Sequence, residues 1–138
     1  MTFKVIEEIE ENHIKDLHLI YQLEWWTEGR QLEDIKKMLQ NTDVIVAFCD
    51  SKTKKLFAFA RVITDYVYKA LILDVIVERS YRKKDLGKTL MESILNHNSL
   101  KSVNHFELYC LPEMVSFYKK FGFSEKLNSL VFMRLTKI

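Results

Sequence analysis

Residues 73–95, LDVIVERSYRKKDLGKTLMESIL, decide the fold of this chain. The stretch opens with an apolar run at 75–77, which is typical of a buried strand. It closes with apolar residues spaced three and four apart, which predict a helix. The mostly charged segment between them runs up to Gly87. The first backbone N–H groups of a helix have no partners inside the helix, and the helix dipole places positive potential there. A strand, a basic turn and a helix start therefore predict a site for a phosphate or pyrophosphate group.

Composition predicts an ordinary globular protein. The 138 residues suggest one domain, 1–138, with a sizeable core, and 48% of them are apolar. The formal net charge of +2 is too small to indicate a nucleic-acid partner. The two cysteines make no disulfide framework, and no cysteine and histidine cluster has zinc spacing, so we expect no metal. The N-terminus does not resemble a signal peptide, and no run reaches the roughly 18 apolar residues of a membrane span. We therefore expect a cytoplasmic protein with no membrane partner.

The pattern along the chain alternates strands and helices. Hydrophobic periodicity and turn residues predict a strand at 3–9, helices after Asn12 and from about Arg30, strands at 44–49, 56–64 and 70–77, a helix to about His97, a strand at 105–110, a short helix between Pro112 and Gly122, and a final strand at 130–135. The helix between strands 70–77 and 105–110 predicts a parallel pair, and short turns predict antiparallel pairs elsewhere. The fold class is thus α/β (α+β), a mixed, mostly antiparallel sheet with helices on both faces. We expect the ligand cleft between the two parallel strands.

Three passages resemble the GNAT superfamily of acyl-CoA-dependent N-acyltransferases. DVIVERSYRKKDLGKTL is similar to the family's strand followed by its pyrophosphate turn. ELYCLPEMVSFYKKFGF is similar to the fifth strand, short helix and terminal Tyr-x-x-x-Gly-Phe, and FARVITDYVYKALILDVIV to the paired central strands. Their order and spacing cover nearly the whole chain. The resemblance implies a GNAT fold in which a splayed parallel strand pair forms the acyl-CoA cleft.

The resemblance implies acetyl-CoA as co-substrate. Its pyrophosphate would lie on backbone N–H groups of the basic turn, and its pantetheine arm would pair with the strand edge like an extra strand. The implied cofactor-binding residues are Val75, Ile76, Val77, Arg82, Lys83, Lys84, Asp85, Leu86, Gly87 and Lys88.

Two residues depart from the family pattern. Asp85 stands where the family usually has its first glycine, and its carboxylate would repel a pyrophosphate. Aspartate also tolerates the left-handed backbone region only moderately. Leu111 replaces an asparagine that contacts the pantetheine in many members. Asp85 would therefore weaken cofactor binding, or Lys83, Lys84 and Lys88 would offset its charge, and the contact to the pantetheine at Leu111 would be missing; neither departure changes the expected fold.

Transfer of an acetyl group to an amine needs a proton for the departing thiolate. The resemblance places Tyr118, four residues before Gly122, at the family's general-acid tyrosine. The alternative is that Tyr118 only packs beside Phe117 and Phe121. Backbone N–H groups around residues 75–77 would polarise the carbonyl.

The base is open between three candidates. Asp74 lies within an apolar strand, where a carboxylate is rarely without a role. It would remove the amine proton, directly or through water, or fix the substrate ammonium, or simply bond to a neighbouring loop. Asp65, before the same strand, is the second candidate, and water alone is the third. Leu71 occupies the position where some members have a glutamate, and it cannot act as a base.

The acceptor site is expected from the first two helices and nearby loops. The candidate substrate-binding residues are Trp25, Trp26, Arg30 and Asp65. The adjacent tryptophans would line an amine pocket or, alternatively, cap the core. Residues 61–90 also resemble the serotonin and arylamine N-acetyltransferases of plants and cyanobacteria, which implies an arylalkylamine acceptor.

The resemblance therefore implies an N-acetyltransferase that moves an acetyl group from acetyl-CoA to a primary amine of a small molecule, by direct attack in a ternary complex. One alternative is a protein or peptide N-acetyltransferase. Another is an inactive GNAT-like module that binds CoA or a partner, which Asp85 favours and Tyr118 opposes. The apolar segment 131–133 makes a homodimer plausible through the C-terminal strand.

Overall fold

The computed structural model describes residues 1–137, and all side chains among them except those of Lys83 and Lys84. The chain forms two compact units, Met1–Leu108 and Tyr109–Ile138. The first contains β1 (Phe3–Ile6), α1 (Glu11–Gln22), α2 (Leu32–Gln40), β2 (Val44–Asp50), β3 (Leu56–Thr64), β4 (Lys69–Val77), the 3₁₀ turn η1 (Arg79–Lys84), α3 (Leu86–Leu95), η2 (Asn98–Leu100) and β5 (His105–Glu107). The second contains η3 (Pro112–Met114) and α4 (Val115–Lys119).

The five strands form one mixed sheet in the order β1-β2-β3-β4-β5. The pairs from β1 to β4 are antiparallel, and β4 pairs with β5 in parallel. The parallel pairing joins Lys69, Ala70 and Leu71 of β4 to residues 105–107 of β5. The mixed, mostly antiparallel sheet predicted from the sequence is confirmed.

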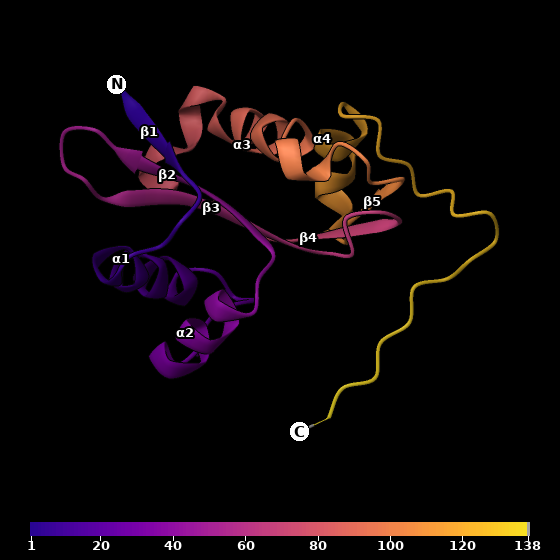
Figure 1. Ribbon diagram of the computed structural model, residues 1–138, viewed down its shortest axis with the longest axis horizontal. Coiled ribbons are helices and arrows are strands. Elements are labelled where there is room, and N and C mark those ends of the chain that lie inside the picture. The colour runs from indigo at the N-terminus through magenta and orange to yellow at the C-terminus, as the bar shows by residue number, and fades with distance from the viewer. Residues whose placement is uncertain (138) are drawn as a thin grey trace. The chain divides into compact units, whose positions relative to one another are not determined.

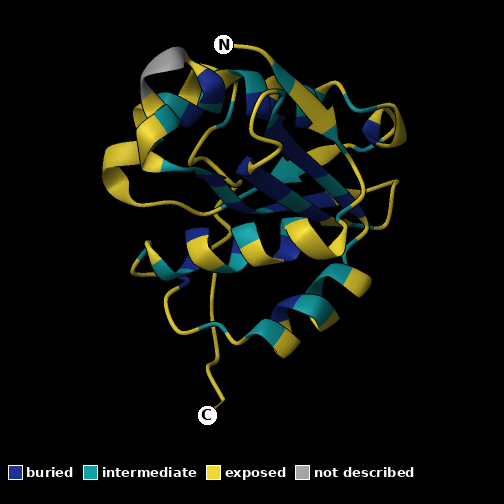
Figure 2. Cartoon of the chain, turned by 90° about the vertical axis from the view of Figure 1, so that its left-hand side faces the viewer, coloured by how far each residue is buried: buried dark blue, intermediate teal, exposed yellow. Residues whose placement is uncertain are grey.

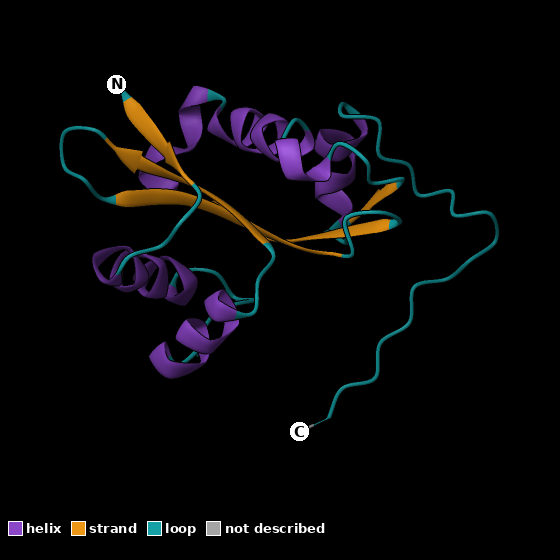
Figure 3. Cartoon of the chain, in the orientation of Figure 1, coloured by secondary structure: helices purple, strands orange, loops and turns teal. Residues whose placement is uncertain are grey.

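Helices cover both faces of this sheet (Figures 1 and 3). α1 and α2 lie on one face, and α3 lies on the other. α1 places Leu17 and Tyr21 in a buried cluster with Phe59 of β3 and Ile76 of β4. α3 buries the stripe that its spacing predicts, Leu86, Leu90, Met91 and Ile94. The central strands are accordingly the most buried part of this unit (Figure 2). No helix of the described chain combines the length and apolar character needed to cross a bilayer.

Two predicted strands are shorter than expected, and one is absent. β1 ends at Ile6 and β5 ends at Glu107. Residues 130–137 form no strand, so the prediction of a final strand at 130–135 is wrong. The unit Tyr109–Ile138 contains no strand among its described residues, and a lone segment without a pairing partner is not stable as a strand.

A bulge interrupts the pairing of β3 with β4. Phe59 lies opposite Ile76 and Arg61 opposite Leu73, so two residues of β4, Asp74 and Val75, face one residue of β3. Asp74 adopts a left-handed backbone conformation with φ 53°. Bulges commonly re-aim side chains beside functional sites. This one fixes the direction in which the Asp74 carboxylate points.

Candidate active site

Asp74 is the centre of a buried polar cluster in the unit Met1–Leu108. Its side chain is 4% exposed. Oδ2 accepts hydrogen bonds from the Tyr21 hydroxyl at 2.9 Å, from Arg30 Nη1 at 2.7 Å and from Arg61 Nε at 2.8 Å. Oδ1 accepts one from Arg30 Nη2 at 3.3 Å. A single carboxylate thus holds two guanidinium groups.

Three separate elements supply the partners of Asp74. Tyr21 comes from α1, Arg30 from the loop before α2, and Arg61 from β3. The guanidinium carbon of Arg30 lies 4.7 Å from the centre of the Tyr21 ring, which adds a cation–π contact. Burial and the neighbouring carboxylate raise the pKa of Tyr21, so this phenol is protonated and donates to Asp74. The cluster therefore joins α1, the α1–α2 loop and the central strands.

The surroundings of Asp74 bear on its predicted role as the base. Burial alone would raise the pKa of its carboxyl, but the hydrogen bonds from Arg30 and Arg61 outweigh burial and leave the pKa below its ordinary value. A carboxylate with a lowered pKa and four donors around it has little tendency to take a proton. This geometry favours a role in positioning Arg30 and Arg61 over direct proton removal.

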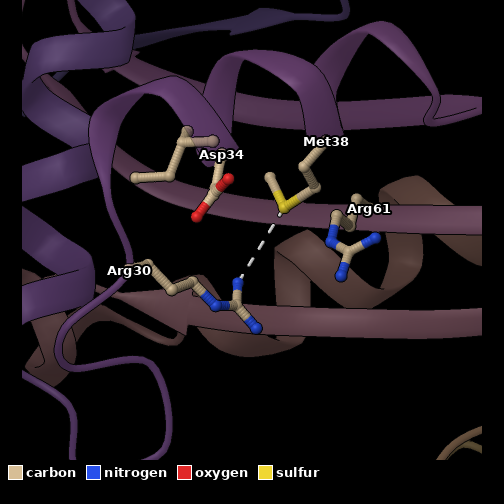
Figure 4. Close-up of a pocket in the computed structure, with 5 residues that line it drawn as sticks. Arg30, Asp34, Met38 and Arg61 are labelled. Carbon is tan, nitrogen blue, oxygen red and sulfur yellow. Dashed lines mark hydrogen bonds between the residues drawn. The ribbon is translucent and has the colours of Figure 1, made fainter. Parts of the chain in front are cut away.

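A pocket of about 260 Å³ lies beside this cluster (Figure 4). Its walls are formed by Arg30, Asp34, Ile35, Met38 and Arg61. Asp34 and Met38 extend from α2, and the two guanidinium groups lie across the pocket from them. Arg30 Nη1 also lies 3.9 Å from the sulfur of Met38. Of the four predicted substrate-binding residues, Arg30 alone lines this pocket.

The other three predicted substrate-binding residues lie elsewhere. Trp25 and Trp26 are 71% and 41% exposed, in the turn after α1. Asp65 forms the β3–β4 turn, where its Oδ1 accepts the backbone N–H groups of residues 67, 68 and 69. These bonds lower the pKa of Asp65. Its contacts therefore favour a turn-forming role over that of a base.

The predicted pyrophosphate turn has the backbone geometry that the sequence indicates. The turn between β4 and α3 is the 3₁₀ helix η1, and α3 begins at Leu86, directly after Asp85. Asp85 adopts the left-handed conformation, φ 54° and ψ 27°, that glycine would adopt without strain. Its side chain does not cap α3, so it leaves the first N–H groups of the helix unsatisfied by a cap. Those N–H groups are the donors that an anion would need.

The charged side chains of the turn are partly engaged. Arg82 donates from Nε to the Val77 carbonyl at 2.8 Å and pairs with Glu24. Arg79 also contacts Glu24, so this carboxylate ties η1 to the end of α1. Lys88 is exposed at the start of α3. The side chain of Leu86 is buried, so only the backbone of Leu86 can contact a bound anion. The predicted side-chain contributions of Lys83 and Lys84 lie outside the described residues.

The edge of β4 is unpaired where the sequence predicts the pantetheine arm. Pairing with β5 stops at Leu71, and in the described chain residues 72–77 have no strand partner on that side. Their backbone includes Val75, Ile76 and Val77, the three residues predicted to pair with the cofactor. Free amide groups on a strand edge can pair with the amides of an extended ligand. Together with the α3 start, this edge offers unpaired backbone groups in both places where the sequence predicts contact with the cofactor.

We predict that Asp85→Gly tightens acetyl-CoA binding by about three- to tenfold, because it removes a negative charge beside the pyrophosphate. The backbone at this position already suits glycine. Calorimetric titration would measure the change. Asp85→Asn is the matched control, because it removes the charge while asparagine still tolerates the left-handed conformation. Unchanged or weaker binding in both variants would show that the turn accommodates the carboxylate.

Tyr118 lies in α4 of the unit Tyr109–Ile138 and is 8% exposed. Its ring packs edge-on against Phe117 and Phe123, with ring centres 5.0 and 6.0 Å away. Burial raises the pKa of Tyr118 to about 12, with a smaller contribution from Cys110. Its hydroxyl makes no hydrogen bond within the part of the chain that is described. The phenol is therefore protonated at neutral pH and holds the proton that the predicted general acid must give, but its raised pKa makes it a weaker acid than a free phenol.

Sequence reasoning missed Arg61 and Tyr21. Arg61 is the only charged residue in the apolar run 56–64, and a buried charge of that kind calls for a partner. Pairing of 56–64 with 70–77 brings it near Asp74, which is the other charge in the hairpin's buried part. Tyr21 gave no such signal, because its position on the apolar face of α1 is equally typical of core packing. Among residues 1–137, no three His, Cys, Asp or Glu side chains lie close enough together to hold a metal ion.

Comparison with known proteins identifies the family. The model of the acetyltransferase (GNAT) domain matches residues 40–125, which run through both units. The chain belongs to the GNAT family. Among GNAT relatives, the chloroplastic GCN5-related N-acetyltransferase 1 of Arabidopsis thaliana is 33% identical over 108 residues, 76% of this chain and 55% of that protein. The chloroplastic serotonin N-acetyltransferase 2 of Oryza sativa is 31% identical over 110 residues, again 76% and 55%. The chain thus spans about half the length of these two GNAT proteins.

Solved structures show the same GNAT fold. A protein of the GNAT family from Xanthomonas campestris superposes with a TM-score of 0.83 and 22% identity, covering 98% of this chain and 94% of that one. Glucosamine-6-phosphate N-acetyltransferase from Arabidopsis thaliana gives 0.73 and 22%, covering 100% and 99%. The predicted α+β GNAT fold with a mixed sheet and the predicted family are therefore confirmed, and the splay of the parallel pair stays a prediction.

Proposed function

We propose that this chain is an acetyl-CoA-dependent N-acetyltransferase that acts, as one domain over 1–138, on a primary amine of a small molecule. The observation that carries the proposal is that the chain has both an unpaired β4 edge and an uncapped start of α3. Both lie in residues 72–88, the stretch most similar to the family's cofactor motif. Membership of the GNAT family supports the reaction, and a relative that is a serotonin N-acetyltransferase supports a small amine as acceptor.

Each candidate residue has a distinct role in this proposal. Acetyl-CoA, when bound, supplies an acetyl thioester whose carbon–sulfur bond breaks as the amine nitrogen takes the acetyl group. Backbone N–H groups at the start of α3 hold the pyrophosphate, and those of residues 75–77 hold the pantetheine. Tyr118 holds the proton that the departing sulfur requires. Asp74 orients Arg30 and Arg61, and water carries the amine proton away.

Two other functions make different predictions. A protein or peptide acetyltransferase would modify a lysine-containing peptide faster than any small amine. An inactive CoA-binding or partner-binding module would bind acetyl-CoA, or a partner, without turnover. The observation that favours the inactive module is the carboxylate of Asp85 at the pyrophosphate turn.

Acetyl transfer to a panel of amines tests the proposal. The purified full chain would be incubated with acetyl-CoA and single amines, and the free thiol of released CoA would be measured. We expect release that depends on both the enzyme and a small primary amine. Release with a lysine peptide only would favour the protein acetyltransferase. Cofactor binding without release from any acceptor would favour the inactive module.

The exposed C-terminal segment supports the proposed homodimer. Its large apolar side chains are 60–86% exposed and form no strand, and they are Leu130, Val131, Phe132, Met133 and Leu135. An apolar segment of this length on a monomer is a common site of association. We propose that it packs with a second copy of this chain.

We predict that the double substitution Val131→Lys and Met133→Lys produces a monomer, because two charges cannot be buried without partners. Size-exclusion chromatography with light scattering would measure the mass. Lys126→Gln with Lys137→Gln is the control, since it changes two charges in the same unit but no apolar side chain. A wild-type protein that is monomeric at tens of micromolar would contradict the proposal. The cytoplasmic location stays a prediction, which imaging of a fluorescent fusion would test.

A further inference from the structure

The two arginines that line the Figure 4 pocket, Arg30 and Arg61, share one carboxylate, that of Asp74. Asp74 neutralises one unit of charge, whereas Arg30 and Arg61 carry two. The guanidinium of Arg61 uses only Nε to bind Asp74, and its side chain is 13% exposed. A net positive charge therefore lies in a half-buried position, where electrostatic interactions are screened less than at the surface.

The unused donors of Arg61 face solvent in the pocket. In the described part of the chain, the two Nη atoms of Arg61 have no hydrogen-bond partner. Every fully buried side-chain nitrogen or oxygen of the described residues does have a hydrogen-bond partner. These Nη atoms must therefore reach solvent, and Arg61 lines the pocket. Two parallel N–H donors on one edge of a guanidinium match the two oxygens of a carboxylate or phosphate.

The rest of the pocket does not cancel this preference. Asp34 is the one acidic residue in its lining, but Asp34 is exposed and therefore well screened by water. Ile35 and Met38 provide an apolar wall on the same helix. A volume of about 260 Å³ holds a small group of a few carbons and one anionic head.

Asp74 links the pocket to the strand predicted to bind the cofactor. Asp74, which holds both arginines, directly precedes Val75, the first of the three residues proposed to bind the pantetheine. An acceptor bound to the two arginines would therefore be held, through Asp74, on the strand that is proposed to bind the pantetheine.

We infer that the acceptor carries an anionic group, a carboxylate or a phosphate, that binds Arg61 and Arg30 in this pocket. The inference rests on the proposed acetyltransferase function and names the substrate class. It also separates this chain from an enzyme for arylalkylamines, which lack an anionic group. Arg61 is then a specificity residue, and Asp74 holds it in place.

Matched acceptors test the inference with the wild-type chain. β-Alanine would be compared with β-alaninamide, and 2-aminoethyl phosphate with ethanolamine, with tryptamine as an arylalkylamine that lacks an anionic group. We expect kcat/KM to be about 10- to 100-fold higher for an acceptor with an anionic group than for its partner without one. The pair that shows the larger ratio distinguishes carboxylate from phosphate. Equal rates within both pairs, or faster turnover of tryptamine, would overturn the inference and leave the acetyltransferase function intact.

A binding experiment separates the proposed anionic acceptor from the proposed acetyltransferase function. The Nε–H signal of Arg61 in a ¹⁵N spectrum would be followed as β-alanine, its amide or 2-aminoethyl phosphate is added. A shift with an anionic probe only, without turnover of any amine, would keep the pocket and overturn the acetyltransferase function. No shift and no turnover would overturn both.

Variants locate the preference in the pocket. Arg61→Gln should raise KM for the preferred anionic acceptor about tenfold or more and bring the ratio close to one, while Arg61→Lys should retain part of it. Lys37→Gln removes an exposed positive charge from the same helix as the pocket wall and should leave the ratio unchanged. If Arg61→Gln does not fold, as judged by circular dichroism, the wild-type ratios decide alone.

Discussion

Replacing Tyr118 by phenylalanine is expected to lower kcat by about 100- to 1,000-fold, because the substitution removes the proposed proton donor. The packing of the ring against Phe117 and Phe123 is retained, since phenylalanine has the same shape. Acetyl-CoA affinity should change by less than about twofold. Steady-state kinetics together with calorimetric titration would measure both quantities.

Tyr109→Phe is the matched control, since it removes an exposed tyrosine hydroxyl from the same unit and should leave kcat unchanged. The raised pKa of Tyr118, about 12, adds a second expectation. The phenol stays protonated well above neutral pH, so kcat should show no alkaline decline below about pH 10 from this group. Equal losses of kcat and cofactor affinity in Tyr118→Phe would indicate that the residue only supports packing.

Replacing Asp74 by asparagine is expected to reduce the free energy of unfolding by about 3 kcal/mol and Tm by about 10 °C. The change leaves Arg30 and Arg61 without their shared counterion, and it places an amide donor against their own donors. Urea denaturation and thermal unfolding would measure the loss. Asp34→Asn, an exposed aspartate with no ion pair among the described residues, is the control and should stay within about 0.5 kcal/mol.

The pH dependence of stability follows from the same contacts. The pKa of Asp74 is lower in the folded state than in the unfolded chain, so its stabilising contribution is complete above the unfolded value of about 3.9 and disappears as the pH falls through the folded value. Wild-type stability should therefore fall below about pH 4, and Asp74→Asn should fall less steeply. A stable Asp74→Asn variant that has lost only turnover would instead support Asp74 as the base.

The fold could be predicted from the sequence because its signals are local. Apolar runs marked β2, β3 and β4, and the four-residue spacing of Leu86, Leu90 and Ile94 marked α3. The helix between β4 and β5 predicted their parallel pairing, which the structure has. The final strand at 130–135 failed for a physical reason. A β-rich composition needs a neighbouring strand to pair with, and composition alone does not supply one.

The candidate site was less predictable, because its contacts are not local. Asp74 attracted attention as a charge in an apolar strand, but its partners lie 13, 44 and 53 residues away. A one-residue bulge between β3 and β4 sets the direction of its side chain, and no pattern in 56–77 marks where that bulge falls. The left-handed conformation of Asp85 was implied by the family's glycine at that position, and the structure has that conformation.

The titration of the full chain with acetyl-CoA, beside free CoA, tests the central claim most directly. An acetyltransferase with a free β4 edge and an uncapped α3 start should bind both ligands with micromolar affinity, since these backbone groups hold the part that the two ligands share. Absence of binding at millimolar concentrations of either ligand would contradict the account, and the fold would then serve a function other than acetyl transfer.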